Sequence, residues 1–258
     1  MLNNYQSIAI VIAIIAGSIG FLGLLHRVWP SEQRRLHNEL IGWQIAVLGT
    51  TYAVIVGFML YAVWTEFQMA DSNAAAEANS LLSVVRASQG LPVDTQREIQ
   101  NLAEKYADVM VNEEWPAMSD FKVSPASHTA IVQLWRVALG ARIHDATAQT
   151  SLDHTLTELS SLSEYRRRRH LQINSALPSI LWAVLVAGAI VTIVSSCMFG
   201  SADFRLHFIQ VFMLALLIGL ALVAIADINR PFQGSVHVDP SGFEHAREIL
   251  PGIRPVTH

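Results

Sequence analysis

The stretch WQIAVLGTTYAVIVGFMLYAVW, residues 43–64, decides the fold because it can cross a membrane as a single helix. It holds no charged side chain, and a tryptophan stands at each end. The hydrocarbon core of a bilayer requires about 20 mostly apolar helical residues, and tryptophan rings favour the membrane–water interface. The stretch also contains polar Gln44, Thr50 and Thr51. These residues raise the question of whether one helix face meets water inside a pore.

Three further apolar runs are long enough to span a bilayer, at about residues 8–25, 180–199 and 206–228. The composition agrees, with 52% apolar and only 15% charged residues and a mean hydropathy of +0.37. The first run lacks a basic start, so we expect a retained anchor and not a cleaved signal peptide. The sequence predicts an all-α integral membrane protein with four transmembrane helices.

The chain divides into four segments by composition. Residues 1–64 form an N-terminal transmembrane pair, and residues 178–230 form a C-terminal transmembrane hairpin. Between them, residues 65–177 carry charges and apolar residues at helical spacing, which predicts a helical cytoplasmic segment. Residues 231–258 follow as a C-terminal tail.

Arginines near the spans indicate the orientation in the membrane. Four consecutive arginines precede the third span, namely Arg166, Arg167, Arg168 and Arg169. The short-loop side also carries arginines, but they are less dense, so we expect both termini and the middle segment in the cytoplasm, at the plasma membrane (the inner membrane of a bacterial cell). The same four residues suit anionic lipid head groups; the alternative is that they determine topology only.

Several function classes find no support in the sequence. The formal net charge of −4 argues against a nucleic-acid partner. The single cysteine and the scattered histidines form no metal-binding pattern, so we expect neither a metal site nor a cofactor. We find no nucleotide-binding loop or nucleophile motif, and therefore no indication of an enzyme.

The second span has two contrasting faces when it is drawn on a helical wheel, with about 100° per residue. Small residues gather on one face and predict close packing between helices; they are Gly42, Ala46, Gly49, Ala53 and Gly57. The opposite face is polar at one end and apolar in the middle, as a pore with an apolar neck would be; it holds Gln44, Leu48, Thr51, Ile55, Phe58 and Ala62. The alternative is that this second face meets lipid.

Acidic residues continue beyond the second span. Glu66, Asp71 and Glu77 could line a charged vestibule, where they would favour cations over anions. The alternative is a solvated outer face, which is the commoner place for carboxylates.

Four stretches resemble bacterial bestrophin-like membrane proteins, which are distantly similar to bestrophin chloride channels. They are HNELIGWQIAVLGTTYAVIVGFMLYAVW with AEANSLLSVVRASQGLP (residues 37–64 and 76–92), RRRRHLQINSALPSILWAVLVAGAI (166–190) and LVAIADINRPFQGSVHVDPSGF (222–243). The resemblance implies four membrane helices per subunit, a pentameric ring and a pore lined by the second helix. The acidic calcium-binding cluster of eukaryotic bestrophins is missing after Phe232, so calcium gating is not implied.

The resemblance therefore implies an oligomeric ion channel, with chloride as the expected ion. Its expected partners are membrane lipid, inorganic ions and further copies of the chain. A membrane scaffold or signalling subunit remains the main alternative, and a transporter the third.

Overall fold

The structure is a computed structural model that describes residues 4–253. Every regular element within these residues is helical, which confirms the predicted fold class. The chain forms two compact units. We call them the membrane unit, made of residues up to Glu66 together with Ala176–Asn229, and the helical unit, made of Phe67–Ser175 together with residues from Arg230 onward.

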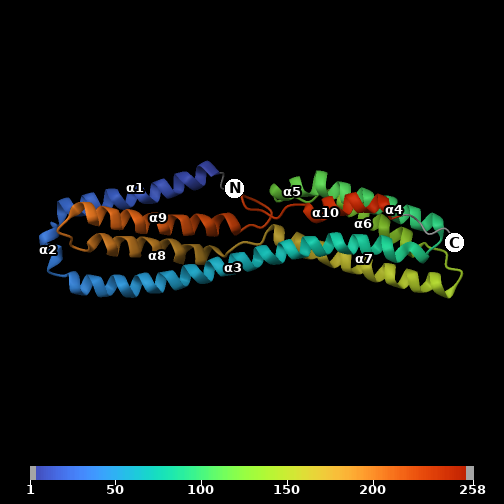
Figure 1. Ribbon diagram of the computed structural model, residues 1–258, viewed down its shortest axis with the longest axis horizontal. Coiled ribbons are helices and arrows are strands. Elements are labelled where there is room, and N and C mark those ends of the chain that lie inside the picture. The colour runs from blue at the N-terminus through green and yellow to red at the C-terminus, as the bar shows by residue number, and fades with distance from the viewer. Residues whose placement is uncertain (1–3, 254–258) are drawn as a thin grey trace. The chain divides into compact units, whose positions relative to one another are not determined.

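The membrane unit consists of long apolar helices. They are α1 (Asn4–Val28), the first part of α3 (Asn38–Ala87), α8 (Ser179–Met198) and α9 (Phe204–Ile228), with the short α2 (Ser31–Arg35) between α1 and α3. Helix α1 lies against α8 and α9, and Figure 1 shows it beside α9. Four helices of the described chain are long and apolar enough to cross a membrane, as the sequence predicted.

Helix α3 extends well beyond the bilayer. Its 50 residues correspond to about 75 Å at 1.5 Å per residue, more than twice the roughly 30 Å hydrocarbon core. The alanine-rich sequence after Trp64 contains no proline to interrupt the helix. The α-helix ends at Ala87, and the 3-10 turn Ser88–Gly90 follows before Pro92. One helix therefore contributes residues to both units.

Close backbone approaches hold the membrane unit together. A Cβ added to Gly188 of α8 would lie 2.5 Å from the ring of Tyr52 on α3, so only glycine fits there. At the short-loop end, the Asn38 amide donates to the Gly200 carbonyl at 2.7 Å and accepts from the Gly200 N–H at 2.8 Å. The fully buried Arg34 guanidinium donates to the Cys197 carbonyl at 2.6 Å, near the end of α8. These contacts fix the start of α3 against the α8–α9 loop.

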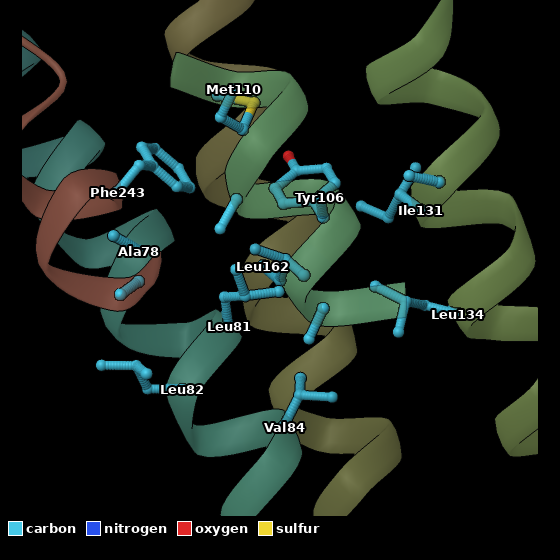
Figure 2. Packing of buried hydrophobic residues seen from close by; sticks show 14 of the residues in the cluster. Ala78, Leu81, Leu82, Val84, Tyr106, Met110, Ile131, Leu134, Leu162 and Phe243 are labelled. Carbon is cyan, nitrogen blue, oxygen red and sulfur yellow. The ribbon is translucent and has the colours of Figure 1, made fainter. Parts of the chain in front are cut away.

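The helical unit contains the second half of α3, the long helix α7 and seven shorter helical elements of the described chain. Their bounds are η1 (Ser88–Gly90), α4 (Val93–Val109), the π-helix η2 (Met110–Glu114), α5 (Trp115–Ser119), α6 (Pro125–Leu139), α7 (Ala146–Ile173), α10 (Ser241–Ile249) and η3 (Leu250–Gly252). Amphipathic faces meet in one apolar core, shown in Figure 2, with Leu81, Tyr106, Leu134, Leu162 and Phe243 fully or almost fully buried.

The segment expected as a C-terminal tail packs into this core as far as it is described. Phe232 and Phe243 lie edge-on to the Trp115 ring, at centroid distances of 5.9 and 5.6 Å. The Trp115 indole N–H donates to the Val238 carbonyl at 2.9 Å. Aromatic packing and a satisfied indole thus fix the chain after α9 to the helical unit.

Candidate functional site

Helix α3 uses a single face for packing inside the membrane unit. Ile41, Tyr52 and Val63 are the buried residues of its membrane portion, with 5%, 7% and 3% of their surface exposed. With Ala53 at zero on the wheel, these three cluster near 260° at about 100° per residue. The rest of the circumference touches little of the subunit, since Val54, Phe58 and neighbouring residues are exposed.

The structure separates the expected pore residues into two groups. Gln44, Thr51, Phe58 and Ala62 are exposed, whereas Leu48 and Ile55 are half-buried. Ile55 packs against the apolar core of the membrane unit. The Thr51 hydroxyl donates to the Val47 carbonyl at 2.8 Å, so Gln44 has the most polar side chain among the six expected pore residues.

The small-residue stripe is largely unused within the subunit. Ala46, Ala53 and Gly57 are exposed, and Gly42 and Gly49 are half-buried. A Cβ added at Gly49 or Gly57 would meet no other side chain or backbone atom within 4 Å, and one at Gly42 would lie 3.9 Å from the Phe199 ring. The stripe therefore has room for a neighbouring helix from outside the subunit.

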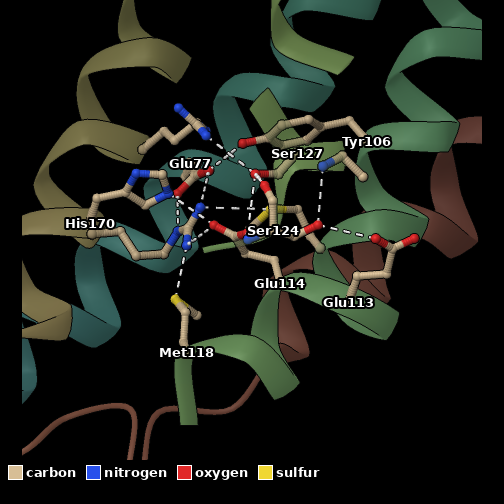
Figure 3. A network of polar contacts seen from close by, with 12 residues as sticks. Glu77, Tyr106, Glu113, Glu114, Met118, Ser124, Ser127 and His170 are labelled. Atoms are coloured by element: carbon tan, nitrogen blue, oxygen red, sulfur yellow. Dashed lines mark hydrogen bonds and ion pairs between the residues drawn. The ribbon is translucent and has the colours of Figure 1, made fainter. Parts of the chain in front are cut away.

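The expected vestibule acids have different environments. Asp71 is exposed and Glu66 is half-buried, but Glu77 is completely buried in the helical unit. Glu77 therefore differs from the expectation of a residue facing an ion path. Its carboxylate accepts from Arg169 Nε at 2.7 Å and from the Tyr106 hydroxyl at 2.6 Å, as drawn in Figure 3.

A second buried carboxylate shares the same arginine. Arg169 Nη1 donates to Glu114 Oε1 at 3.0 Å, and His170 Nε2 lies 2.9 Å from that oxygen. The other oxygen of Glu114 accepts from the Ser124 N–H at 2.6 Å and from the Ser127 hydroxyl at 3.1 Å. Figure 3 shows these groups converging from several helices, with Arg169 and His170 both on α7. We call Glu77, Tyr106, Glu114, Arg169 and His170 the buried ion network.

The local backbone positions Glu114 for this role. It ends the π-helix Met110–Glu114, a wider turn that interrupts the regular helical spacing after α4. The extra residue of a π-turn rotates the following side chains, so that Glu114 and Trp115 are both buried.

Electrostatics favour the ionised state of the network. Burial opposes the charge of Glu114, but the hydrogen bond from His170 and the charge of Arg169 outweigh it and lower the pKa of Glu114 to about 2. Burial also acts against the charge of Arg169, yet the carboxylate of Glu77 raises the pKa of Arg169. Burial, together with the charge of Glu77, holds the pKa of Tyr106 well above its usual value. The network is thus a fixed set of ion pairs.

The four consecutive arginines do not act as one group. Arg169 is completely buried in the ion network, so the structure removes it from the set expected to meet lipid heads. Arg166 donates to the Ser127 hydroxyl at 3.2 Å. Arg167 and Arg168 are exposed, and both bind Glu164 at 2.8 Å. Of the four arginines, Arg167 and Arg168 are therefore the most exposed, and both share the Glu164 carboxylate.

An apolar groove lies within the membrane unit. It measures about 510 Å³, and α1, α8 and α9 line it with residues such as Ile14, Phe21, Val186 and Leu222. Its walls are almost entirely apolar, which suits hydrocarbon and not ions. Among residues 4–253, no group of three or more histidine, cysteine or acidic side chains could hold a metal ion.

Comparisons with known proteins identify the fold. The chain resembles the crystal structure of a bacterial bestrophin homologue from Klebsiella pneumoniae carrying one substitution, with a TM-score of 0.69, 14% identity and coverage of 95% of this chain and 98% of that chain. A structure of the same homologue phased with zinc matches with a TM-score of 0.63 and 12% identity, and the match covers 95% of this chain and 97% of that chain. A crystal structure of a membrane protein with one substitution matches with a TM-score of 0.63 and 13% identity, and the match covers 96% of this chain and 98% of that chain. At these identities the similarity shows the fold alone.

A comparison with curated protein sequences gave no match. The model of the Bestrophin-like domain family, however, matches residues 12–243. This range includes every described membrane helix in whole or in large part and the buried ion network. The chain therefore belongs to the bestrophin-like family.

Proposed function

We propose that copies of this chain assemble into a ring and form an ion channel whose pore is lined by α3. The observation that carries the proposal is the single packed face of α3 in the membrane unit, which leaves Gln44 and Phe58 uncovered. An amide facing hydrocarbon would lose its hydrogen bonds to water at a considerable cost. In a ring, part of this uncovered surface would line the axis, and Gln44, at about 180° on the same wheel, would lie on the flank where a neighbouring copy offers it a partner.

The helical wheel indicates how such a ring would be arranged. If the packed face near 260° points outward, the opposite side near 80° points to the axis, at about 100° per residue. Val54 falls at about 100° and Phe58 at about 140°. The small-residue stripe lies near 0°, on one flank, where a neighbouring helix would pack. We therefore propose Phe58, assisted by Val54, as the apolar neck.

This arrangement refines the pore residues expected from sequence. Thr51 and Phe58 lie on the uncovered side, whereas Leu48 and Ile55 turn toward the subunit's own core. An apolar constriction excludes water when it is narrow, and ions cross it only when it widens or becomes polar. Phe58, whose surface is 65% exposed in the single subunit, has the size and placement for that role.

We further propose that the ions are anions, with chloride as the physiological example. The resemblance to bestrophin chloride channels supports this choice. The burial of Glu77 against Arg169 also supports anions, because it removes from the ion path one of the three acids that would favour cations. We propose five copies per ring and a plasma-membrane location with the helical unit in the cytoplasm. The exposed Arg167 and Arg168, shortly before α8, support this orientation.

The test combines assembly with transport. The purified protein is first weighed in detergent and then placed in chloride-loaded liposomes for an efflux assay. The proposal predicts a discrete oligomer and chloride efflux that rises with protein content. A monomer, or an oligomer without efflux, would contradict the channel and favour a scaffold role.

A further inference from the structure

The loop between α5 and α6 presents a small apolar tip. Phe121 and Val123 each keep 42% of their surface exposed, and Lys122 between them is exposed as well. We call these three residues the Phe121 tip. Single exposed apolar residues are common on protein surfaces, so exposure alone does not indicate a binding site.

The backbone of the tip is held in an unfavourable conformation. Phe121 has a φ of 60°, in the left-handed region that bulky residues rarely occupy. Two hydrogen bonds fix this turn, from the Phe121 N–H to the Met118 carbonyl at 3.1 Å and from the Lys122 N–H to the Ala117 carbonyl at 2.9 Å. Such strain persists where the surrounding structure enforces it, often at binding sites.

Chain connectivity keeps the tip near the membrane. The guanidinium of Arg230 lies 4.7 Å from the centre of the Phe121 ring. Arg230 follows the last residue of α9, Ile228, by only two positions. Two extended residues span about 7 Å, so Arg230 remains close to the end of a membrane helix. A stacked arginine and aromatic ring at that level match the amphipathic groups that favour a membrane interface.

The charges around the tip are mixed, with a small excess of cations. Arg169 Nη1 lies 2.9 Å from the Met118 sulfur, which places the last turns of α7 beside the helix that precedes the tip. The exposed cations of this region are Lys122, Arg167, Arg168 and Arg230. The carboxylates are Asp120, Glu164, which pairs with Arg167 and Arg168, and Glu113, which accepts from the Ser124 hydroxyl at 3.1 Å. Leu171, 65% exposed, adds apolar surface one turn beyond Arg167 and Arg168. An excess of cations beside apolar side chains complements anionic lipid.

We propose that the Phe121 tip is a membrane-surface site for anionic phospholipid head groups. Phe121 and Val123 enter the boundary between head groups and acyl chains, while Lys122 and Arg230 bind phosphate oxygens. The site does not depend on ion conduction. Ser124 directly follows the tip, and its N–H donates to Glu114. A lipid bound at the tip therefore lies next to a residue that hydrogen-bonds to the buried ion network.

The experiment places an environment-sensitive fluorophore on the full-length chain in lipid nanodiscs. Phe121→Cys carries the label in one variant and Leu139→Cys in a matched control. Leu139 is 65% exposed in the same unit, at the other end of α6 and about 20 Å from the start of that helix. The native Cys197 is completely buried, and the unmutated chain serves as the labelling blank. Nitroxide lipids and aqueous iodide are the two quenchers.

The proposal predicts that nitroxide lipid quenches the label at 121 several-fold more than the label at 139, and that iodide shows the reverse order. Phosphatidylglycerol should increase lipid quenching at 121 relative to phosphatidylcholine, and Lys122→Glu should remove that increase. If iodide quenches both labels equally, the tip faces water and the proposal fails. If neither quencher reaches position 121, another protein surface covers the tip, which also overturns it. Equal quenching in both lipids would refute the selectivity for anionic head groups.

Discussion

Phe58→Ser should open the proposed pore more strongly than any other single change in α3. The side chain is 65% exposed in the subunit. A phenylalanine presents on the order of 200 Å², so roughly 130 Å² of apolar surface faces the proposed path. At about 25 cal/mol per Å² this corresponds to about 3 kcal/mol per copy. A tenfold rise in conductance requires only about 1.4 kcal/mol, which is less than half the contribution of one copy.

The assay is single-channel recording of the purified oligomer in planar bilayers, and Ile55→Ser is its matched control. Ile55 lies three positions away, but it packs against the membrane-unit core. We expect Ile55→Ser to lower thermal stability by about 1–3 kcal/mol, because it leaves a cavity and a hydroxyl, without increasing conductance. If Ile55→Ser opens the channel and Phe58→Ser does not, the assignment of the two faces is reversed. If neither changes the current of a correctly assembled protein, α3 is not the gate.

Three further predictions concern assembly, stability and pH. Gly57→Leu should reduce the oligomer mass measured in detergent while the subunit stays folded, because an added Cβ meets nothing inside the subunit. The control Gly188→Ala places a methyl group against the Tyr52 ring and should instead unfold the subunit. An unchanged oligomer mass for Gly57→Leu would contradict the packing role of the stripe. Arg169→Met should lower the free energy of unfolding by about 3–5 kcal/mol, since it leaves Glu77 and Glu114 buried without their cation; a loss under about 1 kcal/mol in calorimetry would show that the ion pairs are not essential. The lowered pKa of Glu114 should stabilise the fold fully above about pH 4.5, and this stabilisation, about 3 kcal/mol in all, should be lost as the pH falls toward about 2. Acid-unfolding curves of Glu114→Gln should lack this loss. Identical curves for the variant and the unmutated protein would refute the stabilising role of Glu114.

The membrane helices were predictable because their signal is local. The expected spans at 8–25, 180–199 and 206–228 fall within α1, within one residue of α8 and within α9. The continuation of α3 past Trp64 also follows from local sequence, since no helix breaker occurs before Gly90. Pro116 lies in the first turn of α5, where proline is tolerated, so it does not interrupt that helix.

The buried ion network could not be predicted, because its partners are distant in sequence. Glu77 and Arg169 are 92 positions apart, and each resembles a surface residue when read alone. Arg169 stands among three other arginines that remain at least partly exposed, so its neighbours give no signal of burial. The pairing depends on the π-helix before Trp115, which no residue pattern in this stretch indicated.

The faces of α3 were only partly predictable for a related reason. The wheel separated small residues from large ones, but it could not show which side the subunit itself covers. Tyr52 determines that side by packing against Gly188, 136 positions later. This contact places Ile55 toward the core and leaves Phe58 outside. Lipid and a neighbouring copy remain chemically similar for the exposed residues, so composition alone does not distinguish them.

The most direct test of the account is the reversal potential of the purified oligomer in a planar bilayer with unequal chloride concentrations on the two sides. The account predicts discrete currents that reverse near the chloride equilibrium potential and that increase in Phe58→Ser. Reversal near the cation equilibrium potential would contradict anion selectivity. A correctly assembled oligomer that carries no current above background, with or without Phe58→Ser, would contradict the channel itself.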